Sequence, residues 1–301
     1  MSELTDLYAA AQTGNVRSLA RLISLLENEA EGSFAFLSEL PTNTSCPVIG
    51  ITGPPGAGKS TLVNSLLGLL CAKKKRIAIL AIDPSSPFNF GALLGDRIRL
   101  SAFYNEENVF IRSFASRGAL GGLAPKIIEI TDLLKTLSFD YIFIETVGVG
   151  QSEVEIAGLA DSTVVVMVPE AGDEIQTMKA GIMEIADIFV VNKADRANAK
   201  QFAQNLRKLT HEKMGEDWTI PVIESVASMG KGADEILQKL KDHDQLNDNN
   251  PKKLALLHQK AIQLIQFQRM KDIDGLELNK TLQEEYLKAD FNLYKFVASY
   301  F

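Results

Sequence analysis

The chain has 301 residues, of which 46% are hydrophobic and 23% are charged, and its formal net charge is -7 at pH 7. This length and composition suit one large globular domain with extensions. The negative charge argues against non-specific binding of nucleic acid or of an anionic membrane. Cys46 and Cys71 have no paired spacing, which predicts no disulfide framework and fits a reducing compartment. Without a signal-peptide pattern or a membrane-spanning apolar run, we expect a cytoplasmic protein.

The N-terminal segment, residues 3–30, has a helical pattern. Asn15 is placed to cap a helix, and the apolar residues after it recur at helical spacing: Leu19, Leu22, Ile23 and Leu26. Residues 41–47 contain prolines and polar side chains and are expected to form a linker. We therefore predict a helical extension over residues 1–45.

The middle of the chain, residues 46–245, alternates apolar runs with helical stretches such as Lys126–Leu137 and Ala199–His211. The apolar runs predict seven strands: Val48–Ile51, Ile77–Ile82, Val109–Arg112, Tyr141–Glu145, Thr163–Val168, Ile188–Asn192 and Val222–Ser225. Continuous apolar strands are typical of a sheet covered on both faces. We therefore predict an α/β fold with a doubly wound, mostly parallel sheet, which would bind ligands at the carboxyl ends of its strands.

Residues 246–301 are predicted to be helical from Pro251 onward. This segment combines an apolar stripe at helical spacing with aromatic residues near its end: Leu254, Leu257, Ala261, Leu264, Ile265, Phe291, Tyr294, Phe296, Tyr300 and Phe301. A terminal tail is usually polar, so this one is expected to bury its apolar residues. Two surfaces could bury this tail. One is the chain's own α/β domain, and the other is a second subunit, because aromatic anchors are favoured at subunit interfaces.

The first motif is the phosphate-loop pattern G-x-x-x-x-G-K-[ST], which is formed by Gly53, Pro54, Pro55, Gly56, Ala57, Gly58, Lys59, Ser60 and Thr61. The alternative is a chance glycine-rich turn, but a strand precedes the motif and a helix follows it. The glycines let backbone N–H groups surround phosphate oxygens, above the positive end of the helix. We expect Lys59 to reach the β- and γ-phosphates and Ser60 to ligate Mg²⁺.

The second motif, N-K-x-D, directly follows the sixth predicted strand as Asn192, Lys193 and Asp195. The carboxylate of Asp195 can accept hydrogen bonds from N1–H and the exocyclic amine of guanine. Adenine has an acceptor at N1 and no amine at C2, so it would leave that carboxylate unpaired. The tetrapeptide alone also suits a surface turn, but its place after a strand and downstream of a phosphate loop indicates a guanine site.

The third element, from Glu145 to Gly148, stands where GTPases usually carry the switch motif D-x-x-G. The acid here is Glu145, and the glycine N–H would contact the γ-phosphate. Val149 takes the place where many signalling GTPases have a water-orienting glutamine, which predicts slow hydrolysis by the protein alone.

Two further carboxylates are candidates for the surroundings of Mg²⁺. Asp83 ends the second predicted strand, and Asp96 lies between Gly95 and Arg97. For Asp83 an Asx turn before proline is an equal alternative. Physical reasoning alone favours a loop charge for Asp96.

Together these motifs resemble the MeaB GTPases, also called ArgK-type proteins, whose human member is the methylmalonic aciduria type A protein. The resemblance covers roughly residues 10–240 and rests on eight segments: Gly53–Thr61, Asp83–Ser86, Gly95–Arg99, Arg117–Ala124, Glu145–Glu153, Gly172–Gln176, Gly181–Asp187 and Asn192–Asp195. It implies a P-loop GTPase fold of the SIMIBI class. It also implies a G-protein chaperone that binds GTP or GDP and serves an adenosylcobalamin-dependent acyl-CoA mutase, gating cofactor loading and protecting the mutase.

The resemblance also implies roles for single residues. The surroundings of Mg²⁺ would be Ser60, Asp83, Asp96 and Glu145. The segment 172–181, with Lys179, would be an additional switch that senses the mutase. Ala227 would contact guanine through its N–H, although Val226 replaces the serine that usually precedes this alanine. Dimerisation through C-terminal helices in this family favours a homodimer over a tail packed on its own domain.

Three other functions are alternatives. A nickel-insertion GTPase usually needs clustered His or Cys ligands, whereas the three histidines here, His211, His243 and His258, are dispersed. A kinase or ATPase linked to arginine and ornithine transport would need an acceptor pocket, for which the sequence offers no convergent set of residues. A regulatory module that binds GTP without turnover would be distinguished by single-turnover hydrolysis with and without a mutase.

Overall fold

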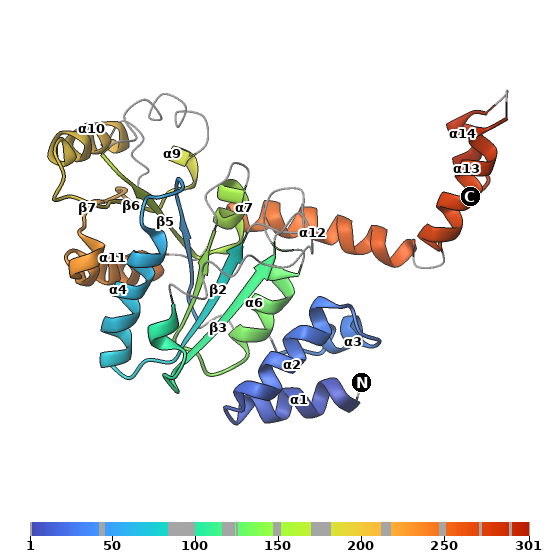
Figure 1. Ribbon diagram of the computed structural model, residues 1–301, viewed down its shortest axis with the longest axis horizontal. Coiled ribbons are helices and arrows are strands. Elements are labelled where there is room, and N and C mark those ends of the chain that lie inside the picture. The colour runs from blue at the N-terminus through green and yellow to red at the C-terminus, as the bar shows by residue number, and fades with distance from the viewer. Residues whose placement is uncertain are drawn as a thin grey trace. The chain divides into compact units, whose positions relative to one another are not determined.

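The computed structural model describes residues 2–41, 46–83, 100–115, 124, 126–146, 152–169, 182–211, 218–246, 251–270, 273–288 and 291–300. The chain forms two compact units, Met1–Lys253 and Leu254–Phe301. Figure 1 shows the elements of both units, each of which is described here by itself. The expected domain boundaries after residues 45 and 245 stay predictions.

The first unit begins with three helices, α1 (Ser2–Gln12), α2 (Val16–Glu27) and α3 (Ser33–Ser38). The helical prediction for this segment is confirmed, with a break between α1 and α2 where Gly14 has φ +93. Asn15 caps α2 as expected, because its side chain accepts a hydrogen bond from Ser18 N–H at 3.0 Å. The four apolar residues predicted to form the inner face are buried: Leu19, Leu22, Ile23 and Leu26.

A seven-stranded parallel sheet forms the centre of the first unit, which confirms the predicted fold class. In chain order its strands are β1 (Val48–Thr52), β2 (Ile77–Asp83), β3 (Val109–Ala115), β4 (Tyr141–Glu145), β5 (Ser162–Met167), β6 (Ile188–Val191) and β7 (Val222–Glu224). In space their order is β3-β2-β4-β1-β5-β6-β7. All seven predicted strands are present, and β3 continues beyond the predicted end at Arg112.

Helices cover both faces of this sheet, as Figure 1 shows. On one face α4 (Lys59–Ala72) packs against β1 and against α11 (Ala233–Asp244), which contacts β5 and β6. On the other face α6 (Ile127–Lys135) contacts β4, and α7 (Ser152–Leu159) contacts β1 and β5. The remaining elements of this unit are η1 (Ser101–Phe103), α9 (Ile182–Ile185), α10 (Ala199–His211) and η2 (Ala227–Met229).

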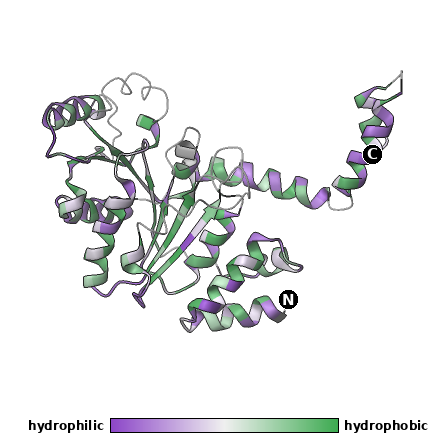
Figure 2. Ribbon diagram, in the orientation of Figure 1, coloured by the Kyte–Doolittle hydropathy of each residue, from purple (hydrophilic) through white to green (hydrophobic). Residues whose placement is uncertain are grey.

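This double covering explains the composition of the strands. Every residue of β1, β5 and β6 is buried, and Figure 2 shows the strands as the most hydrophobic part of this unit. Because β1 lies between β4 and β5, the loops that follow these three parallel strands emerge at one edge of the sheet. That edge is where doubly wound folds bind their ligands.

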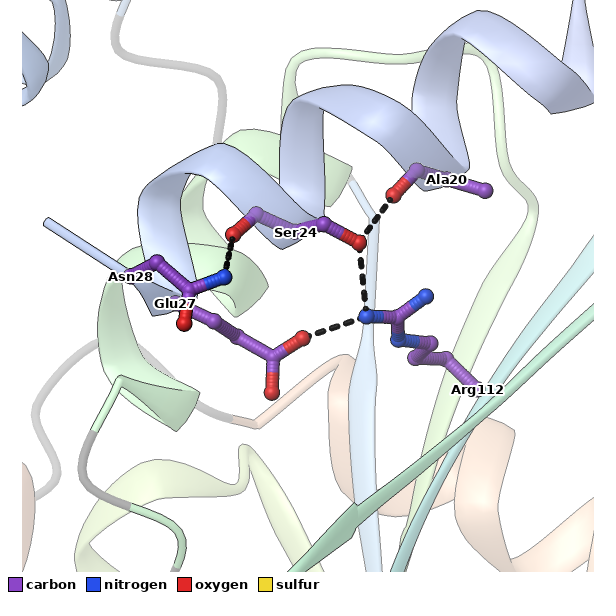
Figure 3. A network of polar contacts seen from close by, with 5 residues as sticks. All are labelled: Ala20, Ser24, Glu27, Asn28 and Arg112. Atoms are coloured by element: carbon purple, nitrogen blue, oxygen red, sulfur yellow. Dashed lines mark hydrogen bonds and ion pairs between the residues drawn. The ribbon is translucent and has the colours of Figure 1, made fainter. Parts of the chain in front are cut away.

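The N-terminal helices are fastened to the sheet by a polar network around Arg112 of β3, shown in Figure 3. The guanidinium of Arg112 donates to Ser24 Oγ at 3.0 Å and to Glu27 Oε2 at 2.5 Å, and both partners lie on α2. Lys126, just before α6, adds an ion pair with Glu29 at 2.6 Å. Charged pairs therefore link α2 to β3, and the turn after α2 to the start of α6.

The second unit is helical, as predicted. It contains most of α12 (Pro251–Arg269), followed by α13 (Gly275–Tyr286) and α14 (Leu293–Ala298). Asp274 and Asn292 cap the last two helices through their side chains. A row of aromatic contacts with ring centroids 5.5 to 6.5 Å apart joins Tyr286, Phe291, Phe296 and Tyr300.

Across the described ranges of the chain, no helix has both the length and the hydrophobicity that crossing a membrane requires.

Candidate nucleotide site

The phosphate-loop sequence follows β1 at the central edge of the sheet. Gly53 leaves the strand with φ +134, and a Cβ added there would lie 2.1 Å from the carbonyl oxygen of Val166 in β5. Only glycine satisfies both constraints, because a side chain would strain the backbone and collide with the neighbouring strand. The start of the loop is thus packed directly against β5.

Lys59 is the first residue of α4, after Gly58 in the left-handed conformation with φ +90. Its side chain is buried, and its ammonium donates to the carbonyl oxygens of Gly53 at 2.8 Å and Pro54 at 3.1 Å. The loop therefore curls around its own lysine, and the helix N-terminus adds partial positive charge at the same place. This arrangement favours an anion in the loop.

Ser60 and Glu145 meet beneath the loop. The hydroxyl of Ser60 donates to Glu145 Oε1 at 2.6 Å, and both residues are buried. Asp83 ends β2, which lies beside β4, and nothing is described of its side chain. Within the described ranges no group of three or more His, Cys, Asp and Glu residues could hold a metal, but Mg²⁺ at a nucleotide needs only one or two protein oxygens besides phosphates and water.

Asn192 joins the two predicted motifs. It follows β6, is 3% exposed, and donates from Nδ2 to the carbonyl oxygen of Ala57 in the phosphate loop at 2.8 Å. Its Oδ1 accepts a hydrogen bond from the N–H of Ala227 at 3.1 Å. A Cβ on Gly58 would lie 2.4 Å from Asn192 Nδ2, so the loop needs glycine there as well. One buried amide thereby fixes the phosphate loop relative to the loop after β7.

The other two residues of the N-K-x-D motif stand beside Asn192. Lys193 has φ +55, and its ammonium donates to Gly56 O at 2.8 Å. The N–H of Ala194 donates to Ser225 O at 3.0 Å. Asp195 is exposed, so its carboxylate is accessible to a ligand from solvent. The hydrogen bond from Lys193 to Gly56 is therefore a second link between this motif and the phosphate loop, beside the one made by Asn192.

The loop after β7 has Val226 at the position where related GTPases usually have a serine, and hydrogen bonds from neighbouring residues still hold this loop. Ser225 Oγ and Val226 N–H both donate to Lys231 O, at 2.9 Å and 3.1 Å. Ala227 N–H, which was expected to face guanine, has Asn192 Oδ1 as its partner in this structure. The N–H of Ala227 is therefore held by Asn192, and the two residues before Ala227 are held by Lys231.

Three predicted site residues, Asp96, Gly148 and Lys179, lie outside the described residues, as does the whole segment 172–181. Their roles stay predictions. Two features of the site were not predicted from the sequence: the bridge made by Asn192, and the contact between the hydroxyls of Thr52 and Thr146, which lie 2.9 Å apart. The signal for the two threonines was their position, directly before the phosphate loop and directly after Glu145.

Two other places in the structure have side chains of types that are reactive in some enzymes, and we interpret both as structural. Ser162 Oγ lies 2.7 Å from His243 Nδ1, and His243 Nε2 lies 3.7 Å from Asp187 Oδ1. This resembles a catalytic triad, but Ser162 is 3% exposed and lies at the start of β5. The start of β5 is at the opposite edge of the sheet from the phosphate loop.

Burial raises the pKa of the Cys46 thiol to about 12, so it stays protonated and unreactive at neutral pH.

Comparison with known proteins decides the family. The sequence model of a family described as "Methylmalonyl Co-A mutase-associated GTPase MeaB" matches residues 19–279. The chain belongs to the MeaB family. A Pyrococcus horikoshii protein named as a GTPase is 39% identical to it over 318 aligned residues, with 99% of each chain covered. The GTPase ArgK of Escherichia coli is 33% identical over 250 residues, which cover 79% of this chain and 75% of ArgK.

A mammalian relative and a solved structure extend this comparison. The mitochondrial methylmalonic aciduria type A homolog of Mus musculus is 36% identical over 201 residues, 64% of this chain and 48% of the mouse protein. A crystal structure described as a LAO/AO transport system kinase covers 99% of this chain and 96% of its own, with a TM-score of 0.68 and 22% identity. That likeness shows a shared fold alone. As a MeaB-family P-loop GTPase, the chain is an enzyme that hydrolyses GTP.

Replacing Asn192 by alanine tests the bridge between the two motifs. The Asn192→Ala variant loses both buried hydrogen bonds, so we expect its affinity for GDP to fall about 10- to 100-fold, since each such bond contributes about 1 kcal/mol. Titration with a fluorescent GDP analogue measures this change. Asn205→Ala is the matched control, because Asn205 is exposed on α10 and bonds only Gln201 among the described contacts. Equal affinities of the two variants would contradict the bridging role.

Proposed function

We propose that this MeaB-family GTPase is a chaperone of an adenosylcobalamin-dependent acyl-CoA mutase, either methylmalonyl-CoA mutase or a relative. It gates the loading of the cofactor and protects the mutase, and GTP hydrolysis drives the cycle. The match of residues 19–279 to a family described by its association with that mutase carries the proposal. The similarity to a protein named for methylmalonic aciduria supports it.

The nucleotide in this proposal lies along the edge formed by β1, β4 and β6. The phosphate loop, Gly53–Thr61, surrounds the β- and γ-phosphates, and the ammonium of Lys59 exchanges its carbonyl partners for phosphate oxygens. Asp195 accepts from the guanine edge, while Asn192, Lys193 and the N–H of Ala227 hold the base site together. The bridge through Asn192 supports this proposal, because it joins the phosphate and base elements into one site.

The proposed Mg²⁺ ligands fit what that ion requires. Ser60 and Glu145 present buried oxygen atoms 2.6 Å apart, and oxygen is the donor that Mg²⁺ prefers. In this proposal Asp83, the last residue of β2, and Asp96 complete the surroundings of the ion. When bound, Mg²⁺ neutralises charge that develops on the β- and γ-phosphates during hydrolysis. The protein supplies the positions of these oxygens and the positive charge of Lys59.

The regulatory part of the proposal rests on the sequence. Val149 cannot orient a water molecule as glutamine does, so turnover by the protein alone is slow. The mutase accelerates it through the segment 172–181, in which Lys179 supplies charge to the site. The N–H of Gly148 contacts the γ-phosphate and couples the state of the nucleotide to this segment.

The test is GTP turnover by the full chain with and without purified methylmalonyl-CoA mutase. We expect the mutase to accelerate wild-type turnover, because it completes the site. Lys179→Ala should lose most of that acceleration and keep its basal rate, whereas Lys200→Ala, an exposed lysine of α10, should behave as wild type. If the free protein already turns over as fast as the mutase-bound protein, the gating role is wrong.

We further propose that the protein is a homodimer formed through residues 246–301. The row of aromatic contacts from Tyr286 to Tyr300 supports this, since it gives the second unit a concentrated aromatic surface of the kind found at subunit interfaces. In size-exclusion chromatography with light scattering, the full chain should have about twice its 33.0 kDa mass. A chain ending at Asn250 should be a monomer. A monomeric full chain at tens of micromolar would refute the dimer.

A further inference from the structure

Two buried threonines meet where β1 and β4 end. Thr52 is the last residue of β1 and is 0% exposed, and Thr146 directly follows the last residue of β4 and is 1% exposed. The hydroxyl of Thr146 donates to Thr52 Oγ1 at 2.9 Å. Buried polar groups need partners, and in this pair each hydroxyl supplies one for the other.

This bond lies beyond the end of the strand ladder. β1 and β4 are paired as far as Ile51 and Glu145, and the N–H of Thr146 then donates to Ile51 O at 3.0 Å. Thr52 is the last residue of β1 and still pairs with Val165 of β5, and Gly53 then turns sharply into the phosphate loop with φ +134. The hydroxyl pair therefore joins the end of β1, where the phosphate loop begins, to the residue that follows β4.

The residue beside this bond is Glu145, whose carboxylate lies 2.6 Å from Ser60 Oγ. A shift of the Thr146 backbone would move Glu145 relative to the first turn of α4. We infer that the Thr52–Thr146 hydroxyl pair is a positioning element for GTP hydrolysis, which holds Glu145 against the phosphate loop. The inference rests on the proposed role of Ser60 and Glu145 at Mg²⁺. Partners of metal-binding residues commonly change metal affinity or activity by about 10- to 100-fold when they are removed.

Valine substitutions separate this role from ordinary packing. Valine has nearly the shape of threonine but lacks the hydroxyl, so Thr52→Val or Thr146→Val breaks the bond and leaves the other hydroxyl without this partner. The double variant removes both hydroxyls together. If the pair acts as a unit, the second substitution adds little to the first, which a double-mutant cycle measures.

The neighbouring strand offers a matched control. Thr163 of β5 is 0% exposed and is paired in register with Gly50 of β1. Within the described residues its hydroxyl has no hydrogen-bond partner. Thr163→Val is therefore the same chemical change at the same depth in the same sheet, without a hydroxyl bond to lose.

The experiment measures GTP turnover of full-length variants over a range of Mg²⁺ concentrations, and GDP affinity without Mg²⁺. We expect each single valine variant to need about tenfold more Mg²⁺ for half-maximal turnover and to show a lower kcat. The double variant should match the single ones. Thr146→Ser and Thr163→Val should keep the wild-type Mg²⁺ requirement, and GDP affinity without Mg²⁺ should be unchanged in all variants.

Several outcomes would overturn the inference. They are an unchanged Mg²⁺ requirement in both single valine variants, additive losses in the double variant, or the same loss in Thr163→Val. A loss in Thr146→Ser would also overturn it, and this arm holds even if a valine variant fails to fold. Absence of GTP turnover in the wild type would instead reject the assignment of hydrolysis to this site, so the two failures are distinguishable.

Discussion

The side-chain amide of Asn192 is the contact on which the arrangement of the site depends. Its two halves bond Ala57 O in the phosphate loop and Ala227 N–H after β7, and both bonds are shielded from water. Breaking such buried bonds costs about 1–3 kcal/mol for each group left without a partner. The elements proposed to hold the phosphates and to read the base are therefore fixed relative to each other.

The order of the strands makes this contact possible. With β1 between β4 and β5, and β6 next to β5, the phosphate loop is flanked by Glu145 on one side and by the N-K-x-D motif on the other. Gly53 lies so close to Val166 of β5 that a methyl group would not fit. The sheet thus fixes the charged and polar groups before a ligand arrives, which is the condition under which electrostatic stabilisation of a transition state is strongest.

Local sequence patterns predicted the parts of the site, and the fold brings them together. The phosphate loop was recognisable because its glycines and lysine occur at fixed spacing between a strand and a helix. The bridge from Asn192 to Ala57 spans 135 residues, and the bond between Thr52 and Thr146 spans 94, so no local pattern reveals that these residues are in contact. Threonine is also an ordinary strand residue, which left that pair unnoticed. Likewise, only the structure shows that Ser225 and Val226 hold their loop through Lys231.

Competition binding of GTP, ATP and XTP to the wild type and to Asp195→Asn tests the guanine site most directly. The wild type should bind GTP more tightly than ATP by a factor on the order of 10⁴, because adenine leaves the Asp195 carboxylate without its partners. Asp195→Asn should prefer XTP, since its amide can donate to the carbonyl at C2 of xanthine. Equal affinity of the wild type for GTP and ATP would contradict the account.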